Sequence, residues 1–129
     1  LLGTVHDPAV CIRRFLKTKT GKGMEQAARA GKLHREQPFV LGVPAETIQK
    51  EWSGDETVLV QGIIDAFFYE DGEIVLMDYK TDRLYREEDF RERYGIQLEY
   101  YRRALEQITG KQVKETWIYS FTLGRAIRL

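Results

Sequence analysis

The chain has 129 residues, 43% of them hydrophobic and 31% charged, which is typical of one soluble globular domain with its own core. The formal net charge is zero, and the chain contains neither an apolar run long enough to span a membrane nor a signal peptide. The single cysteine, Cys11, excludes an internal disulfide and an iron–sulfur cluster held by this chain alone, and it fits a reducing, cytoplasmic setting.

Helices are expected in the N-terminal part of the chain. The pair Asp7-Pro8 is typical of a helix N-terminus, because aspartate caps a helix and proline suits its first position. The glycine-containing segment 20–23 is expected to end this helix. A short second helix is expected over about residues 24–30, with Gly31 as its C-cap.

Three strands are expected next. Residues 36–43 alternate between apolar and polar side chains, and Pro38 within them favours an edge strand. Residues 44–56 are expected to form a loop. Two further strands then flank Asp71-Gly72, a strong signal for a tight hairpin turn because both central positions need a positive φ.

The hairpin turn sets the register of its two strands. It places Asp65 opposite Asp78, with Lys80 diagonally beside Asp65 on the same face. Two opposed carboxylates with apolar neighbours repel one another and lose hydration, so a divalent cation is the expected compensation. Two histidines are too few for a histidine-based metal site, so oxygen ligands favour Mg²⁺ or Mn²⁺, with Ca²⁺ also open.

Two simpler interpretations of the hairpin stay open. The carboxylates could lie on a solvated face of the sheet, or Lys80 could simply neutralise one of them. The apolar residues 74–77 occupy both faces of their strand, which indicates a central strand and argues against the solvated face.

A long helix and a last strand complete the expected fold. The helix is expected over about residues 87–108, ended by Gly110, and the strand over residues 113–123. The helix can return the last strand parallel to an earlier one, so the fold class is α/β with a mixed sheet. The apolar stripe of the helix comprises Phe90, Tyr94, Leu98, Tyr101, Leu105 and Ile108, and the last strand carries Trp117, Tyr119 and Phe121 on one face.

Charge is unevenly distributed along the chain. Residues 12–35 carry eight Lys/Arg and one Glu, whereas residues 36–78 carry ten Asp/Glu and one Lys. An acidic centre beside basic segments suits a metal site bordered by a phosphate-binding surface, although ordinary solvated helix faces explain any single basic cluster equally well. The basic candidates for contact with a phosphate backbone are Arg83, Arg86, Lys17 and Lys22.

Four stretches, taken together and in this order, resemble the RecB-like branch of the PD-(D/E)xK nuclease superfamily. Each stretch alone is a weak signal, but the four with this spacing are specific. Within that branch the chain is most similar to the C-terminal nuclease domain of the large subunit of AddAB-type bacterial helicase–nucleases, from about Ile12 to the end. The stretches are 31–39 (GKLHREQPF), 62–65 (GIID), 78–82 (DYKTD) and 97–101 (QLEYY).

The resemblance implies a fold and a site. The fold is a restriction-endonuclease-like mixed sheet of about four strands flanked by helices, in the order helices, three strands, helix, strand. The whole of residues 1–129 is then one nuclease domain, expected to be a C-terminal part of a larger helicase–nuclease. In the site, Asp65, Asp78 and the carbonyl of Tyr79 would bind metal, Lys80 would be the catalytic lysine, and Gln97 and Tyr101 would support the active site.

The resemblance gives further expectations for Glu36 and for the two histidines. Glu36 matches a recurrent acidic position and is expected to support the metal ligands or bind a second metal, with His34 a surface residue beside it. The family also carries a Gly-Thr-x-x-His motif, whereas residues 3–6 (GTVH) have a spacing one residue short. His6 is therefore expected to be incidental, the true motif to lie upstream, and the metal site to be incomplete.

The expected function is that of a Mg²⁺-dependent deoxyribonuclease, with Mn²⁺ as an alternative metal. By resemblance it would be an exonuclease acting in double-strand-break repair and recombination. Its DNA would be single-stranded, fed by helicase domains of the parent chain working with a partner nuclease subunit. One alternative is an inactive nuclease-fold module for DNA binding or subunit docking. Another is a Mg²⁺-dependent enzyme on a different phosphate ester, which the lack of a complete nucleotide-binding loop disfavours.

Overall fold

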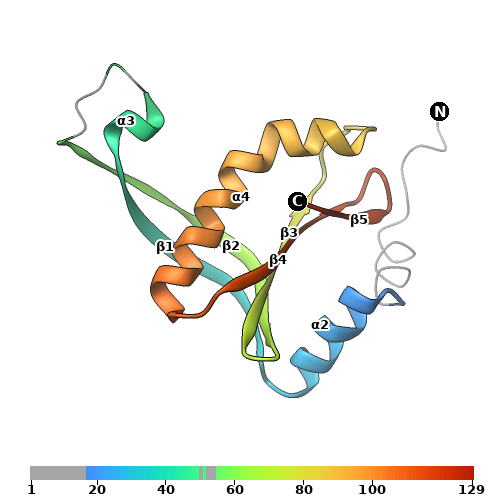
Figure 1. The fold of residues 1–129 in the computed structure, drawn as a ribbon. Helices are drawn as coiled ribbons and strands as arrows, with labels where there is room; N and C mark the ends of the chain where they lie inside the picture. Colours follow the sequence, from blue (N-terminus) through green and yellow to red (C-terminus); the bar gives the residue numbers. More distant parts are fainter. Residues whose placement is uncertain (1–16, 50, 52–54) are drawn as a thin grey trace.

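The computed structural model describes residues 17–49, 51 and 55–129, and the helix expected after Asp7-Pro8 lies outside them. A five-stranded mixed sheet has the strand order β1-β2-β3-β4-β5, in which only the β3–β4 pair is parallel (Figure 1). The elements are α2 (Lys19–Arg29), β1 (Leu33–Pro44), α3 (Ala45–Ile48), β2 (Thr57–Glu70), β3 (Glu73–Lys80), α4 (Glu87–Thr109), β4 (Val113–Ser120) and β5 (Arg125–Arg128).

The predicted α/β architecture is confirmed, with one strand more than expected. Helix α4 ends at Thr109 and is capped by Gly110, which adopts the left-handed conformation (φ 70°) suited to a glycine cap. The helix returns β4 parallel to β3. The predicted last strand ends earlier, at Ser120, because a turn over residues 121–124 reverses the chain into β5. Strand β1, which contains Pro38, lies at the edge of the sheet as predicted.

Apolar side chains fill both faces of the sheet. One core lies under α4, where Phe90, Leu98 and Leu105 pack against strand residues including Ile64 and Leu76. A smaller core lies under α2, and it joins residues of that helix to the opposite face of the strands. Ile108 does not belong to the buried stripe, contrary to the sequence prediction, because it lies 54% exposed near the end of α4. No helix in the described part of the chain is long and apolar enough to cross a membrane.

The N-terminal helix differs from the prediction. Residues 20–23 do not end a helix but lie inside α2, which begins at Lys19 with Thr18 as N-cap. The Thr18 hydroxyl accepts a hydrogen bond from the Gly21 amide at 3.0 Å, which satisfies one of the free amides of the first turn. A Cβ on Gly23 would lie 3.0 Å from Glu70 Oε2, so this glycine lets α2 approach the sheet closely. The loop expected over residues 44–56 likewise contains the short helix α3.

The hairpin has the predicted register near its turn. Glu70 pairs with Glu73, and the ladder continues to the pair Ala66–Met77. Asp71 and Gly72 both have positive φ, 55° and 80°, as the predicted turn requires. Beyond Ala66 and Met77 the ladder stops, immediately before the two aspartates that the same register would oppose.

Along β1 and β2, the regular alternation of side chains between the two faces of the sheet is interrupted at one position in each strand. In β2, Ile64 belongs to the core under α4 whereas Ala66 belongs to the core under α2, although both have even numbers. Strict alternation would put them on the same face. The change occurs at Asp65 and at Glu36, its counterpart in β1, which has a positive φ of 51°. Both acids therefore lie where the strand backbone is irregular.

Candidate active site

The site begins where β2 and β3 part. The amide of Tyr79 donates a hydrogen bond to Asp65 Oδ2 at 2.8 Å, so a side-chain carboxylate takes the place of a backbone acceptor from the neighbouring strand. On its other side β3 stays paired with β4 through Lys80 and Ser120. The carboxylate of Asp65 is thereby held at the open end of the hairpin, beside the end of β3.

Asp78 lies buried at this end, with only 2% of its surface exposed. Its pKa is raised to about 7: burial is the largest cause, the neighbouring Asp65 adds to the shift, and Lys80 opposes it. Its Oδ2 atom has no hydrogen-bond partner among the described residues, although the Lys80 ammonium lies 2.8 Å away. The ion pair with Lys80 offsets only part of the cost of this buried carboxylate, because burial and the neighbouring Asp65 still raise its pKa.

Lys80 is fixed by three groups. Its ammonium lies 2.8 Å from Asp78, donates a hydrogen bond to Gln97 Oε1 at 2.9 Å, and sits 4.0 Å from the ring centre of Tyr94. The Tyr94 hydroxyl in turn donates to an oxygen of Asp82 at 2.5 Å. The structure thus brings Lys80 and Gln97 together with the two aspartates, while the catalytic roles of all four stay predictions.

Tyr101 lies deeper, in the core under α4. Its ring packs edge-on against Phe39, with centroids 5.2 Å apart. A Cβ at Gly62 would lie 3.1 Å from Phe39 and 3.5 Å from Tyr101, so this glycine makes room for both rings. Burial raises the pKa of the Tyr101 hydroxyl, and the charges of Asp78 and Asp65 add to the shift. Tyr101 therefore forms part of the wall behind the carboxylates.

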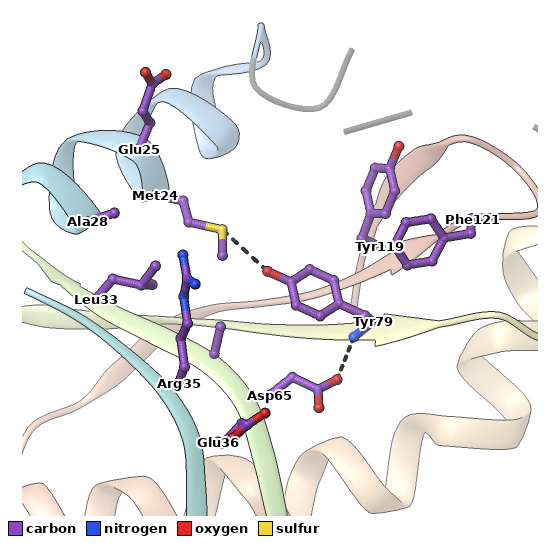
Figure 2. Close-up of a pocket in the computed structure, with 11 residues that line it drawn as sticks. Met24, Glu25, Ala28, Leu33, Arg35, Glu36, Asp65, Tyr79, Tyr119 and Phe121 are labelled. Carbon is purple, nitrogen blue, oxygen red and sulfur yellow. Dashed lines mark hydrogen bonds between the residues drawn. The ribbon is translucent and has the colours of Figure 1, made fainter. Parts of the chain in front are cut away.

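Glu36 and His34 lie on β1, next to this end of β2. Glu36 is exposed and lines the same cavity as Asp65 (Figure 2). Its role at a metal stays a prediction. His34 is exposed and stacks on Phe67 at a centroid distance of 4.6 Å, which agrees with the predicted surface position.

The four basic candidates lie outside this cluster. Lys17, Lys22 and Arg83 are exposed, and Arg86 forms an ion pair with Asp89 at 2.8 Å. Within the described residues no hydrogen bond or ion pair joins any of them to the carboxylates. Their contact with a phosphate backbone stays a prediction.

Sequence reasoning missed two residues around the site. The sequence places Tyr94 in the apolar stripe alone, yet its ring contacts the Lys80 ammonium and its hydroxyl binds Asp82. Its position three residues before Gln97 places it on the same helix face and is the available signal. Arg35 lines the cavity beside Asp65, and only its position next to Glu36 points to it.

The donor set fits a divalent cation with oxygen ligands. No group of three or more His, Cys, Asp or Glu residues in the described ranges could hold a metal by itself. Asp65 and Asp78 do converge, however, and the buried Asp78 carboxylate has the Lys80 ammonium as its close positive charge among the described residues. Hard cations such as Mg²⁺ commonly use one or two protein carboxylates and complete their shell with water and substrate phosphate.

Comparisons with known proteins agree with this arrangement. The chain is similar to three proteins that are each named as a subunit of an ATP-dependent helicase/nuclease, and every match covers 92% of this chain. The relative from Clostridium perfringens (strain ATCC 13124) is 41% identical over 125 residues, that from Syntrophomonas wolfei 44% over 120, and that from Acetivibrio thermocellus 42% over 125. The chain spans about 10% of the length of each.

A family model gives the same result. The model described as the PD-(D/E)XK nuclease superfamily matches residues 11–126, nearly the whole chain, including Asp65, Asp78, Lys80 and Gln97. The resemblance seen in the four sequence stretches is thereby confirmed at the level of the family. The chain belongs to the PD-(D/E)XK nuclease superfamily.

Proposed function

We propose that this chain is the nuclease domain of a larger helicase–nuclease and that it hydrolyses phosphodiester bonds in DNA with a divalent cation, Mg²⁺ or Mn²⁺. The observation that carries the proposal is the buried Asp78 carboxylate, which converges with Asp65 while a single ammonium, that of Lys80, lies 2.8 Å from its Oδ2 atom. Such an arrangement is costly for a folded protein without a cation.

Asp65, Asp78 and the carbonyl of Tyr79 would hold the cation. A bound cation would supply positive charge at the scissile phosphate and would make a coordinated water more acidic. Because Asp65 already accepts the Tyr79 amide at 2.8 Å, its carboxylate is oriented before any cation arrives. Orientation of this kind lowers the cost of assembling the site.

Lys80 would orient the attacking water or stabilise negative charge developing on the phosphate. The hydrogen bond to Gln97 and the contact with Tyr94 would hold its ammonium in place when a cation competes for Asp78. Gln97 is in this account a positioning residue, because it acts through Lys80. Tyr101 would shape the wall behind the carboxylates, and Glu36 would support the metal or bind a second one.

The finer assignments rest on the sequence resemblance, and the relatives' name supports only the helicase/nuclease part of them. We propose an exonuclease that acts on single-stranded DNA during double-strand-break repair and recombination, with helicase domains of the same polypeptide and a partner nuclease subunit. These activities and partners concern a protein about ten times longer than this chain. A cytoplasmic setting stays a prediction from the single cysteine.

One observation favours a second candidate, a catalytically inactive module for DNA binding or subunit docking. The Lys80 ammonium lies 2.8 Å from Asp78, so the lysine neutralises the aspartate in the absence of a cation. In an inactive module this ion pair would persist, because no cation would bind and displace the lysine from Asp78.

A nuclease assay separates the two candidates. End-labelled single- and double-stranded DNA would be incubated with the chain in Mg²⁺, Mn²⁺, Ca²⁺ or EDTA. We expect cleavage of single-stranded DNA in Mg²⁺ or Mn²⁺ and none in EDTA. DNA binding without cleavage in any of these ions would favour the inactive module.

A further inference from the structure

A cavity of about 560 Å³ opens beside the carboxylates, on the face of the sheet under α2. Asp65 and Glu36 line one end of it, and the ring of Tyr79 lies next to them (Figure 2). The cavity is therefore continuous with the candidate active site through Asp65. It lies on the opposite face of the sheet from Lys80 and its partners on α4.

The walls of this cavity are largely aromatic and apolar. Tyr79 and Phe121 form one wall, with ring centroids 6.4 Å apart, and Tyr119 packs edge-on against Phe121 at 5.2 Å. Met24 of α2 accepts a hydrogen bond on its sulfur from the Tyr79 hydroxyl at 3.6 Å, which limits movement of that ring. Tyr79 is nevertheless 37% exposed and lines the cavity, so part of this residue is open to a ligand.

Arg35 supplies the one basic side chain among the described residues that line the cavity. It forms no ion pair within the described part of the chain, so its guanidinium is available to an anion. Figure 2 shows this side chain across the cavity from the aromatic wall. An exposed aromatic ring, an unpaired guanidinium and a metal-binding carboxylate in one cavity match the three parts of a nucleotide strand: base, phosphate and scissile phosphodiester.

From this arrangement we propose that the cavity accepts a nucleobase of the substrate strand, next to the phosphodiester that is cleaved, with the base against Tyr79 and Phe121 and an adjacent phosphate on Arg35. The inference rests on the proposed nuclease function and adds the position of one base. A base inside a duplex cannot enter such a cavity without leaving its stack, so the cavity selects single-stranded DNA. Stacking on aromatic rings tolerates any base, so the selection is for strand state and not for sequence.

The test measures whether one base and the aromatic wall depend on each other. Fluorescein-labelled single-stranded oligonucleotides, intact or with one abasic site placed at successive positions, are titrated by anisotropy against Lys80→Ala protein in EDTA, so that turnover is prevented. We expect an abasic site at one position to raise the Kd by about tenfold, on the scale of one lost base stack. Phe121→Leu and Tyr79→Leu in the same background should raise the Kd for intact DNA similarly, and should add no further loss at that abasic position.

Two controls make the outcome specific. Trp117→Leu removes a half-buried aromatic from the same face of the sheet outside this cavity, and should leave the abasic profile unchanged. Arg35→Gln should reduce the salt slope of binding by about one, as expected for one phosphate contact. Melting temperatures of all variants identify any loss caused by unfolding.

The proposal is overturned if an abasic site raises the Kd equally at all positions. It is also overturned if an abasic site raises the Kd of the Tyr79→Leu and Phe121→Leu proteins by the same factor as it raises the Kd of the protein with both rings intact. It is also overturned if Phe121→Leu and Tyr79→Leu lower the melting temperature without changing Kd, since the cavity would then be a packing surface for protein. Failure of the nuclease proposal looks different: the wild-type chain would cleave nothing in any divalent cation, whereas the binding profile would still be measurable.

Discussion

The two ends of the β2–β3 hairpin differ in strand pairing and in the burial of charge. At the turn end, residues pair in regular register and alternate between two apolar cores. At the open end, the ladder stops, alternate side chains of β1 and β2 switch faces of the sheet at Glu36 and Asp65, and the buried Asp78 carboxylate lies beside both Asp65 and the Lys80 ammonium. The regular end supplies the rigidity that holds an unfavourable set of charges at the other, which is the usual relation between a scaffold and a functional site.

The largest expected effect comes from removing a carboxylate at the open end. Asp78→Asn should lower the cleavage rate by roughly 10³-fold or more, because a lost cation removes several kcal/mol of charge stabilisation in the transition state. Glu73→Gln is the matched control, since it removes an acid from the turn end of the same strand. Single-turnover cleavage of labelled DNA measures the rates of both variants. Equal losses of cleavage rate in Asp78→Asn and Glu73→Gln would show that the two ends of the hairpin do not differ in function.

Lys80 gives the next largest effect. Lys80→Ala should lower turnover by roughly 10²-fold, the scale seen when one electrostatic stabiliser is deleted. Binding of DNA should weaken only slightly, with a change of about one at most in its salt slope. Rates per bound complex and salt-dependent anisotropy separate these quantities. Weaker binding with unchanged cleavage would mean that Lys80 only contacts phosphate.

The stability of the metal-free chain should depend on pH through Asp78. Its folded-state pKa of about 7 lies above the ordinary 3.8, so the folded state holds this proton more tightly. The resulting stabilisation is present below about pH 4 and is lost as the pH rises through 7. Relative to Asp78→Asn, the wild-type chain in EDTA should lose on the order of 1–3 kcal/mol of unfolding free energy across that range.

Urea denaturation at several pH values measures this difference. Asp78→Asn should be as stable as the wild-type chain at pH 8, or more stable. A large loss of stability in Asp78→Asn at pH 8 would instead identify Asp78 as a structural partner of Lys80.

The smallest expected effect concerns the backbone at Glu36. Its φ of 51° is strained for any residue with a Cβ, so Glu36→Gly should be more stable than Glu36→Ala by about 1 kcal/mol. Both variants remove the carboxylate, so the comparison isolates the backbone. At Gln37, the next residue in β1, the order should reverse, with Ala more stable than Gly. Urea denaturation of the four variants in EDTA measures their unfolding free energies. If Gly and Ala rank in the same order of stability at both positions, the backbone at Glu36 is not strained.

The regular parts of this molecule could be predicted from the sequence because local rules decide them. The Asp71-Gly72 turn, the Gly110 cap and the parallel return of β4 follow from turn chemistry and helix length. The expectation that Asp65, Asp78 and Lys80 gather at one place follows from the turn register, but the observed ladder already ends at Ala66–Met77, and Lys80 forms its ion pair with Asp78 rather than lying beside Asp65.

The remaining features depend on tertiary packing. Gly23 predicted the end of a helix, but its lack of a side chain instead permits close packing of α2 on Glu70. Glu36 has a strained backbone conformation, and the Asp65 carboxylate accepts a hydrogen bond from the Tyr79 amide. Neither feature produces a periodic pattern in the sequence. The contacts of Tyr94 and Arg35 likewise depend on which groups other elements bring beside them.

The most direct test of the account is cation binding itself, measured by calorimetry at pH 8 together with the melting temperature. Mg²⁺ or Mn²⁺ should bind the wild-type chain and raise its melting temperature, with about 2.7 kcal/mol of added stability at a hundredfold excess over Kd. Asp65→Asn and Asp78→Asn should each lose most of this effect, whereas Glu73→Gln should keep it. Undiminished binding in both aspartate variants, or no binding by the wild-type chain, would contradict the claim that these two carboxylates form a metal site.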